Sequence, residues 1–152
     1  MLQKINSMKY LKYVLIAFMT LTILACSSND EDENISDCET CTYTPKPNET
    51  AGIAPSSLEG TYNVVLDFAT AQSPFPEGTA ATFTLTNNVL TVEISGEACI
   101  TLENPIQTGT SEWTFIDDCR DNYIYGISQN QNGEFNEINL GTTNFQFLGQ
   151  FK

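Results

Sequence analysis

The sequence predicts an all-β domain, an antiparallel meander of about eight short strands, and three observations support this fold class. Apolar and polar residues alternate with a period of two through most of the chain after residue 57. Short stretches rich in Asn, Asp and Gly separate the alternating runs. No stretch keeps a helical spacing of apolar residues over about twelve positions. We expect the meander to form a small closed barrel, with a sandwich as the alternative.

The first half of the domain carries the clearest strand pattern. In residues 61–68, TYNVVLDF, apolar side chains occupy alternate positions. Residues 81–86 and 90–94 alternate in the same way. Asn87 and Asn88 lie between them, and asparagine tolerates the positive φ of a two-residue hairpin turn. The sequence therefore predicts a hairpin at this point.

The second half continues the same alternation. Residues 117–122 and 129–133 are polar and are predicted to be turns. The final run is expected to place Phe145, Phe147 and Phe151 on one face of the last strand. Strands are predicted at residues 98–102, 113–115, 123–128, 135–140 and 144–152.

Residues 1–25 have the organisation of a secretory signal peptide. Three lysines and no acidic residue precede an uncharged apolar run at residues 13–24. This run is shorter than the roughly 20 apolar residues that a membrane-spanning helix needs. A complete signal also begins at Met8, so the sequence leaves the start codon open between Met1 and Met8.

The signal ends in a stretch that resembles a bacterial lipobox. Ile23, Leu24 and Ala25 precede Cys26. By this resemblance, Cys26 would receive a diacylglycerol on its sulfur and become the first mature residue. Two acyl chains are enough for stable membrane anchoring. The alternative is an ordinary signal peptide with a chance cysteine at its end.

An acidic run, DEDE at residues 30–33, follows the cysteine. It resembles the export signal of Bacteroidetes-type surface lipoproteins, which implies an outer-membrane location facing the cell exterior. The alternative is a solvated spacer, since such a run repels itself and stays extended. No hydrophobic periodicity follows up to residue 57, and three prolines favour an extended backbone. We expect residues 26–57 to be a disordered tether and residues 58–152 to be the barrel.

The mature chain is strongly acidic. All 19 carboxylate side chains follow Cys26, whereas Lys46, Arg120 and Lys152 are the remaining cations, so the formal net charge is close to −16. Such a field repels phosphate backbones, and no basic stripe reverses it locally. We therefore expect no nucleic-acid partner.

Five cysteines fit an exported chain. If Cys26 carries the lipid, then Cys38, Cys41, Cys99 and Cys119 form an even set that indicates two disulfides. Three connectivities are open, and we favour Cys38–Cys41 with Cys99–Cys119. The C-x-x-C motif could also be a redox pair or part of a zinc site, but no helix pattern follows it and the chain has no histidine.

Asp117, Asp118 and Asp121 form the tight carboxylate group outside the tether. Such a group could bind calcium, or a pair of its members could hydrolyse a glycoside. The favoured interpretation is a solvated turn between two strands. Because histidine is absent, Ser–His and Cys–His nucleophile pairs are excluded. We expect no enzymatic activity and no cofactor.

The start of the domain, LEGTY at residues 58–62, resembles lipocalin-like small β-barrel lipoproteins. In that family a Gly-x-Trp element opens the first strand; here Gly60 matches and Tyr62 replaces the tryptophan. The resemblance implies a barrel whose interior holds an apolar ligand.

A ligand cup would use aromatic residues that carry a polar group able to orient a guest. The alternative is that they fill the core, because eight strands leave room only for side chains or one small ligand. The candidates are Tyr62, Trp113, Tyr123 and Tyr125.

Three functions stay open from the sequence, in the following order. The first is a lipid-anchored, non-catalytic binding domain for a small apolar molecule, a sugar or a partner protein. The second is a structural or accessory subunit of an outer-membrane protein complex. The third is a small hydrolase or calcium-dependent module that uses Asp117, Asp118 and Asp121.

Overall fold

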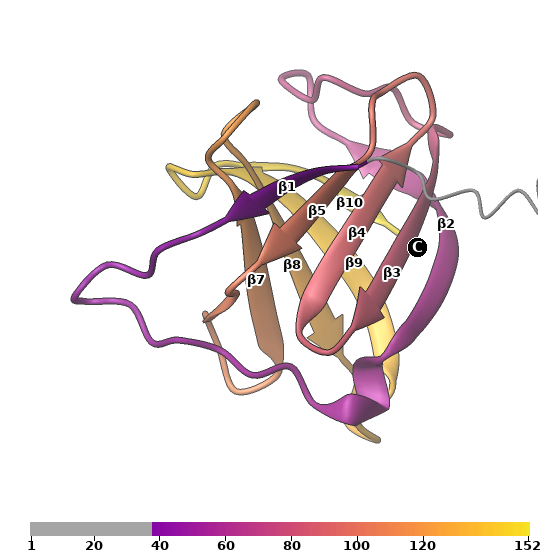
Figure 1. Cartoon of the computed structure of the whole chain (residues 1–152). Helices are drawn as coiled ribbons and strands as arrows, with labels where there is room; N and C mark the ends of the chain where they lie inside the picture. Colours follow the sequence, from indigo (N-terminus) through magenta and orange to yellow (C-terminus); the bar gives the residue numbers. More distant parts are fainter. Residues whose placement is uncertain (1–37) are drawn as a thin grey trace, which may run out of the picture. The chain divides into compact units, whose positions relative to one another are not determined.

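The computed structural model describes residues 38–152, which form ten β-strands and one short 3-10 helix, η1 (Ser56–Leu58) (Figure 1). Cys26, the predicted signal and the acidic run lie outside the described residues. Within residues 38–152, no helix is long and apolar enough to cross a membrane. The strands are β1 (Glu39–Thr42), β2 (Gly60–Ala69), β3 (Ala80–Thr86), β4 (Val89–Ile94), β5 (Ile100–Glu103), β6 (Ile106–Gln107), β7 (Glu112–Asp117), β8 (Tyr123–Gln129), β9 (Phe135–Thr142) and β10 (Phe147–Phe151).

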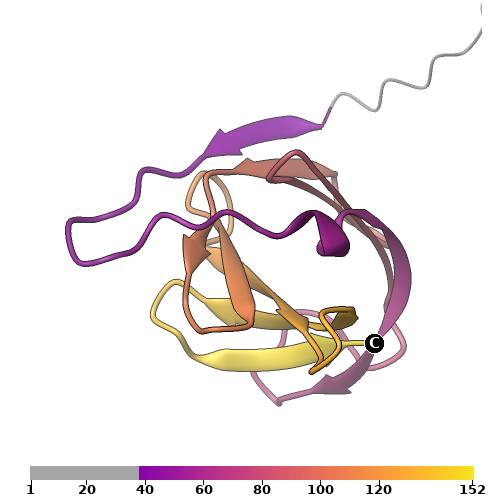
Figure 2. The same cartoon turned by 90° about the horizontal axis from the view of Figure 1, so that it is seen from below.

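All ten strands belong to one sheet, in the order β1-β5-β4-β3-β2-β10-β9-β8-β7-β6. Every neighbouring pair is antiparallel except β1 and β5, which are parallel. The sheet curls around one interior, as the view from below shows (Figure 2). The prediction of an all-β meander is confirmed.

The prediction of a closed eight-stranded barrel is wrong, because the sheet is curled but ends at β1 and β6. The expected strand at residues 98–102 is followed by a break and a second short strand. Asn104 adopts a positive φ of 59° at this break. Pro105 follows it and has no N–H to donate to a ladder. The backbone therefore bends between β5 and β6, and each pairs with a different half of the sheet.

The hairpin between β3 and β4 confirms the strongest prediction from the sequence. Asn87 and Asn88 have φ values of 50° and 67°, as a two-residue turn requires. Leu85 pairs with Leu90 on the inward-facing side of the two strands, where both side chains are fully buried.

Side chains from both halves of the sheet fill its interior. The ring of Phe83 lies 5.2 Å from that of Phe151 and 5.9 Å from that of Tyr125, between centroids. Close packing of this kind leaves little empty space. The fully buried large side chains are Leu58, Leu66, Phe83, Leu85, Leu90, Ile100, Leu102, Phe115, Tyr125, Ile127, Ile138 and Phe151.

The last strand is shorter than expected. β10 begins at Phe147, and its pairing register shifts between Phe147 and Gly149. A shift of one residue moves side chains to the opposite face of a sheet. Phe151 is therefore buried, whereas Phe145 and Phe147 are exposed, and the prediction that the three share one face is wrong.

Residues 38–57, called the N-terminal segment below, belong to the fold rather than to a disordered tether. β1 pairs with β5. Further along, Gly52 N–H donates to the Pro105 carbonyl at 2.7 Å, and Gln107 N–H donates to the Thr50 carbonyl at 2.8 Å. The segment therefore makes hydrogen bonds on both sides of the bend between β5 and β6. Figure 1 shows it running below the sheet to η1.

Both disulfides join the N-terminal segment to the rest of the domain. They are Cys38–Cys99 and Cys41–Cys119, so the pairing that we favoured is wrong. Residues three apart in an extended strand are separated by about 10 Å, which is too far for a disulfide. The parallel pairing of β1 with β5 instead brings Cys38 to 4.9 Å from Cys99, between Cα atoms.

Candidate functional site

The residues predicted to form a ligand cup are part of the packed domain. Trp113 and Tyr125 are buried in the core, and burial raises the pKa of the Tyr125 phenol above its usual value. The ring of Tyr62 stacks on Phe135 at 3.9 Å between centroids, and its hydroxyl donates to the Leu58 carbonyl at 2.6 Å. Tyr123 packs against the core, so none of the four candidates encloses a cup.

The hollow beside Tyr123 and Tyr125 is too small for an organic ligand. It measures about 10 Å³, and the edge of the Tyr123 ring meets Phe75 at 6.2 Å between centroids. A volume of roughly 10–15 Å³ holds about one water. This hollow therefore offers no room for the apolar guest that the lipocalin resemblance implied.

The aspartates of the β7–β8 turn are organised around Arg120. Its backbone N–H donates to Asp117 Oδ1 at 3.0 Å, and its Nε lies 3.6 Å from Asp117 Oδ2 and 3.4 Å from Asp121 Oδ2. Its Nη1 donates to the Ala98 carbonyl at 2.8 Å. Asp117 is fully buried, and this burial raises its pKa, while the hydrogen bond and charge of Arg120 oppose the shift. The guanidinium of Arg120 thus lies between the carboxylates of Asp117 and Asp121.

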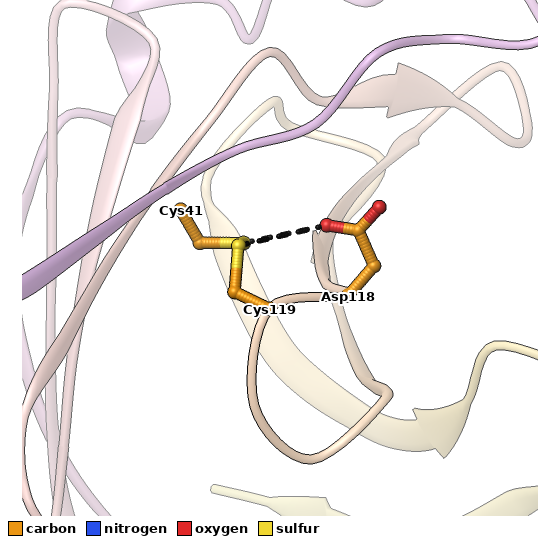
Figure 3. A group of neighbouring side chains, drawn as sticks. All are labelled: Cys41, Asp118 and Cys119. Atoms are coloured by element: carbon orange, nitrogen blue, oxygen red, sulfur yellow. Dashed lines mark hydrogen bonds between the residues drawn. A yellow bond between two sulfur atoms is a disulfide. The ribbon is translucent and has the colours of Figure 1, made fainter.

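The third aspartate faces a disulfide. Asp118 Oδ1 lies 3.4 Å from Cys41 Sγ and 3.8 Å from Cys119 Sγ (Figure 3). The bonded sulfurs carry no hydrogen, so these are contacts and not hydrogen bonds. In the part of the chain that the structure describes, these three residues are the one cluster with the spacing of metal ligands. Because a disulfide offers no thiolate to a metal, the cluster is not a metal site in the oxidised protein.

A groove of about 460 Å³ lies on the outer face of β7, β8 and β9, beside the turn that leads into β10. We call it the β7–β9 groove. It combines apolar walls with several polar side chains. Its lining residues are Thr108, Glu112, Thr114, Ile124, Gly126, Asn139, Leu140, Gly141, Phe145, Gln146 and Phe147.

Hydrogen bonds hold the polar side chains of this groove in place. Glu112 accepts from Thr108 Oγ1 at 2.8 Å and from Asn139 Nδ2 at 3.3 Å. The hydroxyls of Thr108 and Thr114 are 2.8 Å apart, and Gln150 Nε2 donates to Asn139 Oδ1 at 3.2 Å. Fixed polar groups among apolar walls are typical of small-molecule sites.

Two glycines shape the floor of the β7–β9 groove. A Cβ at Gly126 would lie 3.1 Å from Glu112 Cδ, and one at Gly141 would lie 3.0 Å from the Gln146 carbonyl oxygen. Glycine at these positions lets the Glu112 side chain lie close to β8 and lets the turn approach β9. Side chains there would displace the groups that form the groove.

Exposed aromatic rings border the β7–β9 groove on the side of β10. The side chains of Phe145 and Phe147 are 61% and 44% exposed. Phe147 stacks against Phe68 at 6.1 Å between centroids, and Phe68 is itself half exposed. Neighbouring exposed rings form an apolar patch, and contiguous apolar patches often mark binding surfaces.

Two other hollows lie on the outer surface. One of about 160 Å³ shares Phe145 with the β7–β9 groove, and there Tyr43 donates to Glu49 at 2.8 Å. Burial and the Glu49 carboxylate raise the pKa of Tyr43 to about 12. The other, of about 600 Å³ over β2, β3 and β4, is more open, and no aromatic residue lines it.

The β7–β9 groove was not predicted from the sequence. Its residues come from four strands and two turns, so no local motif marks it. One available signal was Gly126 inside the predicted strand at residues 123–128, because glycine within a strand often marks a close approach. No family model, no curated protein and no solved structure matches this chain, so the groove is assigned from its geometry.

Proposed function

We propose that this chain is a lipid-anchored outer-membrane protein, facing the cell exterior, with a non-catalytic binding domain. Its ligand binds in the β7–β9 groove on the outside of the curled sheet and not in the interior. The observation that carries this proposal is the contrast between a filled interior and an outer groove with fixed polar groups and exposed rings. The lipobox resemblance at Cys26 and the acidic run after it support the anchoring and the outward location.

The composition of the groove supports binding without catalysis. Glu112 is the one carboxylate among its lining residues, and it already accepts two side-chain hydrogen bonds. Glycoside hydrolysis by the usual route needs a pair of carboxylates facing each other across the substrate. The groove thus favours a site that holds a ligand unchanged.

The second candidate function is an accessory subunit of an outer-membrane protein complex. It is favoured by the exposed pair Phe68 and Phe147, because stacked rings at a surface can pack against a protein partner. Co-purification of the lipidated chain with a membrane complex, lost on substitution of both rings by serine, would support this function over the first.

Anchoring and binding are tested separately. Cys26→Ala should release the protein from membranes. Deletion of residues 30–33 should protect the protein from external protease without preventing lipidation. A protein that stays accessible after the deletion would show that the acidic run is only a spacer.

Binding is tested by thermal unfolding of the purified full-length lipoprotein against oligosaccharides, peptides, apolar small molecules and calcium. A ligand at 100 times its Kd stabilises the native state by about 2.7 kcal/mol. Asn139→Ala should abolish the shift, because Asn139 lines the β7–β9 groove. The matched control is Asn63→Ala. Asn63 is an outward-facing asparagine in β2 that lines the hollow of about 600 Å³ over β2, β3 and β4. Equal binding by both variants would contradict the proposal.

A further inference from the structure

We infer that the β7–β9 groove binds a short, uncharged oligosaccharide and that Phe145 is the residue on which a sugar ring stacks. This inference rests on the proposed function of the groove as the binding site. It adds the ligand class and assigns a specificity-determining residue.

The backbone of Phe145 is the first observation. Phe145 has a φ of 58°, in the left-handed region that bulky residues avoid. The four other non-glycine residues with positive φ in residues 38–152 are all asparagine, which tolerates this conformation. These four residues are Asn87, Asn88, Asn104 and Asn122.

The turn around Phe145 would be more stable with glycine at position 145. Phe145 N–H donates to the Thr142 carbonyl at 2.7 Å, and Thr142 N–H donates to the Gln146 carbonyl at 2.9 Å. This is a tight hairpin loop whose last residue is left-handed, a position that glycine normally occupies. A phenylalanine here opposes the local stability of the hairpin, and strained residues of this kind cluster at functional sites.

The ring of Phe145 contributes little burial or packing to the fold. It is 61% exposed, and within residues 38–152 it forms no ring–ring contact, whereas Phe147 stacks on Phe68. It lines both the β7–β9 groove and the smaller hollow beside Tyr43. The ring is therefore placed where two hollows meet, open to a ligand in either.

The polar groups of the groove match the chemistry of a sugar. A pyranose presents an apolar C–H face to an aromatic ring and hydroxyls around its edge. The Glu112 carboxylate accepts hydrogen bonds, the Asn139 and Gln146 amides both donate and accept, and the threonine hydroxyls do the same. A purely apolar ligand would leave the remaining hydrogen-bonding capacity of these groups unused, which is unfavourable.

The position of the groove argues against a peptide that binds as an added strand. Peptides that add to a sheet pair with an exposed edge strand. The β7–β9 groove lies on the face of β7, β8 and β9, which are all paired on both sides. A ligand there must be held by side chains, as a sugar is.

Charge restricts the sugar to an uncharged one. No lysine or arginine lines the groove, and Glu112 does. The mature chain carries three cations against 19 carboxylates. Sulfated or uronic-acid sugars would be repelled by this field. The volume of about 460 Å³ lies within the roughly 300–1,000 Å³ of small-molecule sites, so a short oligosaccharide fits.

The experiment uses the full-length lipoprotein with defined neutral, uronic-acid and sulfated oligosaccharides, measured by calorimetric titration. The wild type should bind at least one neutral oligosaccharide. Phe145→Gly should weaken that binding about tenfold or more, a change of about 1.4 kcal/mol. The same substitution should raise Tm by about 3–6 °C, since glycine relieves the backbone strain. Phe145→Trp, which keeps an aromatic face, should retain binding.

Several outcomes would overturn the inference. These are no binding of any neutral oligosaccharide, binding of charged sugars alone, binding that Phe145→Gly leaves unchanged, or a lower Tm for Phe145→Gly. Asn139→Ala separates these failures from a failure of the proposed function. If another ligand class binds and Asn139→Ala abolishes that binding, the groove is a binding site and only the sugar assignment is wrong. If Asn139→Ala leaves all binding intact, the groove is not the site.

Discussion

Cys41 lies in the edge strand β1 and is bonded to Cys119, in the turn after β7, near the other end of the ten-stranded sheet. The disulfide therefore joins two parts of the sheet that no hydrogen-bonded ladder connects. We expect the double variant Cys41→Ser/Cys119→Ser to lose about 2–4 kcal/mol of unfolding free energy. Denaturant titration of the oxidised protein measures this loss, and an unchanged midpoint would contradict it.

The Cys38–Cys99 disulfide provides a matched control for the loss of the Cys41–Cys119 crosslink. Cys38→Ser/Cys99→Ser removes a crosslink between two strands that hydrogen bonds already join. In the Cys41 and Cys119 variant, by contrast, the amides of Gly52 and Gln107 should exchange faster with solvent, because they hold the N-terminal segment at the bend. Native-state hydrogen exchange distinguishes the two variants.

Asp117 gives the stability an unusual dependence on pH. Burial raises its pKa above the ordinary 3.8, so at higher pH the native state retains a proton that the unfolded chain releases. The stability contributed by Asp117 therefore falls as pH rises from the pKa of the unfolded chain to the raised pKa of the native state. Asp117→Asn keeps an acceptor for the Arg120 N–H but does not titrate. Its stability relative to wild type should improve between pH 4 and pH 7.

Glu49 supplies a control of opposite sign. The Lys46 N–H and the Tyr43 hydroxyl lower the pKa of Glu49 below the ordinary 4.5. The stability that Glu49 contributes is fully present above its ordinary pKa of 4.5 and is lost as pH falls through the lowered pKa. Glu49→Gln should therefore lose more stability relative to wild type at pH 7 than at pH 3. Equal trends for the two variants in denaturant titrations would contradict both assignments.

Gly149 is required where β10 pairs with β2, opposite Ala69. A Cβ added there would lie 2.7 Å from the Phe68 carbonyl oxygen, a contact that the backbone must relieve by moving. We expect Gly149→Ala to lower the unfolding free energy by about 1–3 kcal/mol. Gly109→Ala is the matched control, since its nearest neighbour would be Glu112 Cβ at 3.9 Å. A difference of less than about 0.5 kcal/mol between the two would contradict this account.

Trp113 reports directly on the interior. It is the one tryptophan of the chain, and it is 6% exposed. We expect a blue-shifted fluorescence maximum and weak quenching by acrylamide in the native protein, with strong quenching after unfolding. Because the interior is filled, long-chain fatty acids should leave the spectrum unchanged. A spectral shift on their addition would show that the interior opens to apolar ligands after all.

The parts of the fold that the sequence predicted well are those determined by neighbouring residues. The alternation in residues 81–86 and 90–94 and the two asparagines between them were sufficient for β3, β4 and their turn. The register of β10 was not predictable in this way. A bulge after Phe147 changes which face each later residue occupies, and nothing in an alternating pattern marks where a bulge falls.

The N-terminal segment was missed because its structure depends on distant partners. β1 has too few apolar residues to show a period, and it is held by β5 and by two disulfides to residues at least 61 positions away. The β7–β9 groove was missed for a related reason. Its polar residues read individually as the solvated face of strands, and only the curl of the sheet and the β9–β10 turn bring them together.

The disulfides also determine what proteolysis can do to the protein. The exposed stretch of residues 44–48 lies between Cys41 and Cys99, where a protease could cut. A single cut there leaves Cys38 and Cys41 in one fragment and Cys99 and Cys119 in the other, joined by both disulfides. Nicked protein would thus run as one band on a gel without reductant and as two with it. If the chain is anchored at Cys26 as we propose, a domain clipped at this loop would stay attached to the anchor until a reductant released it.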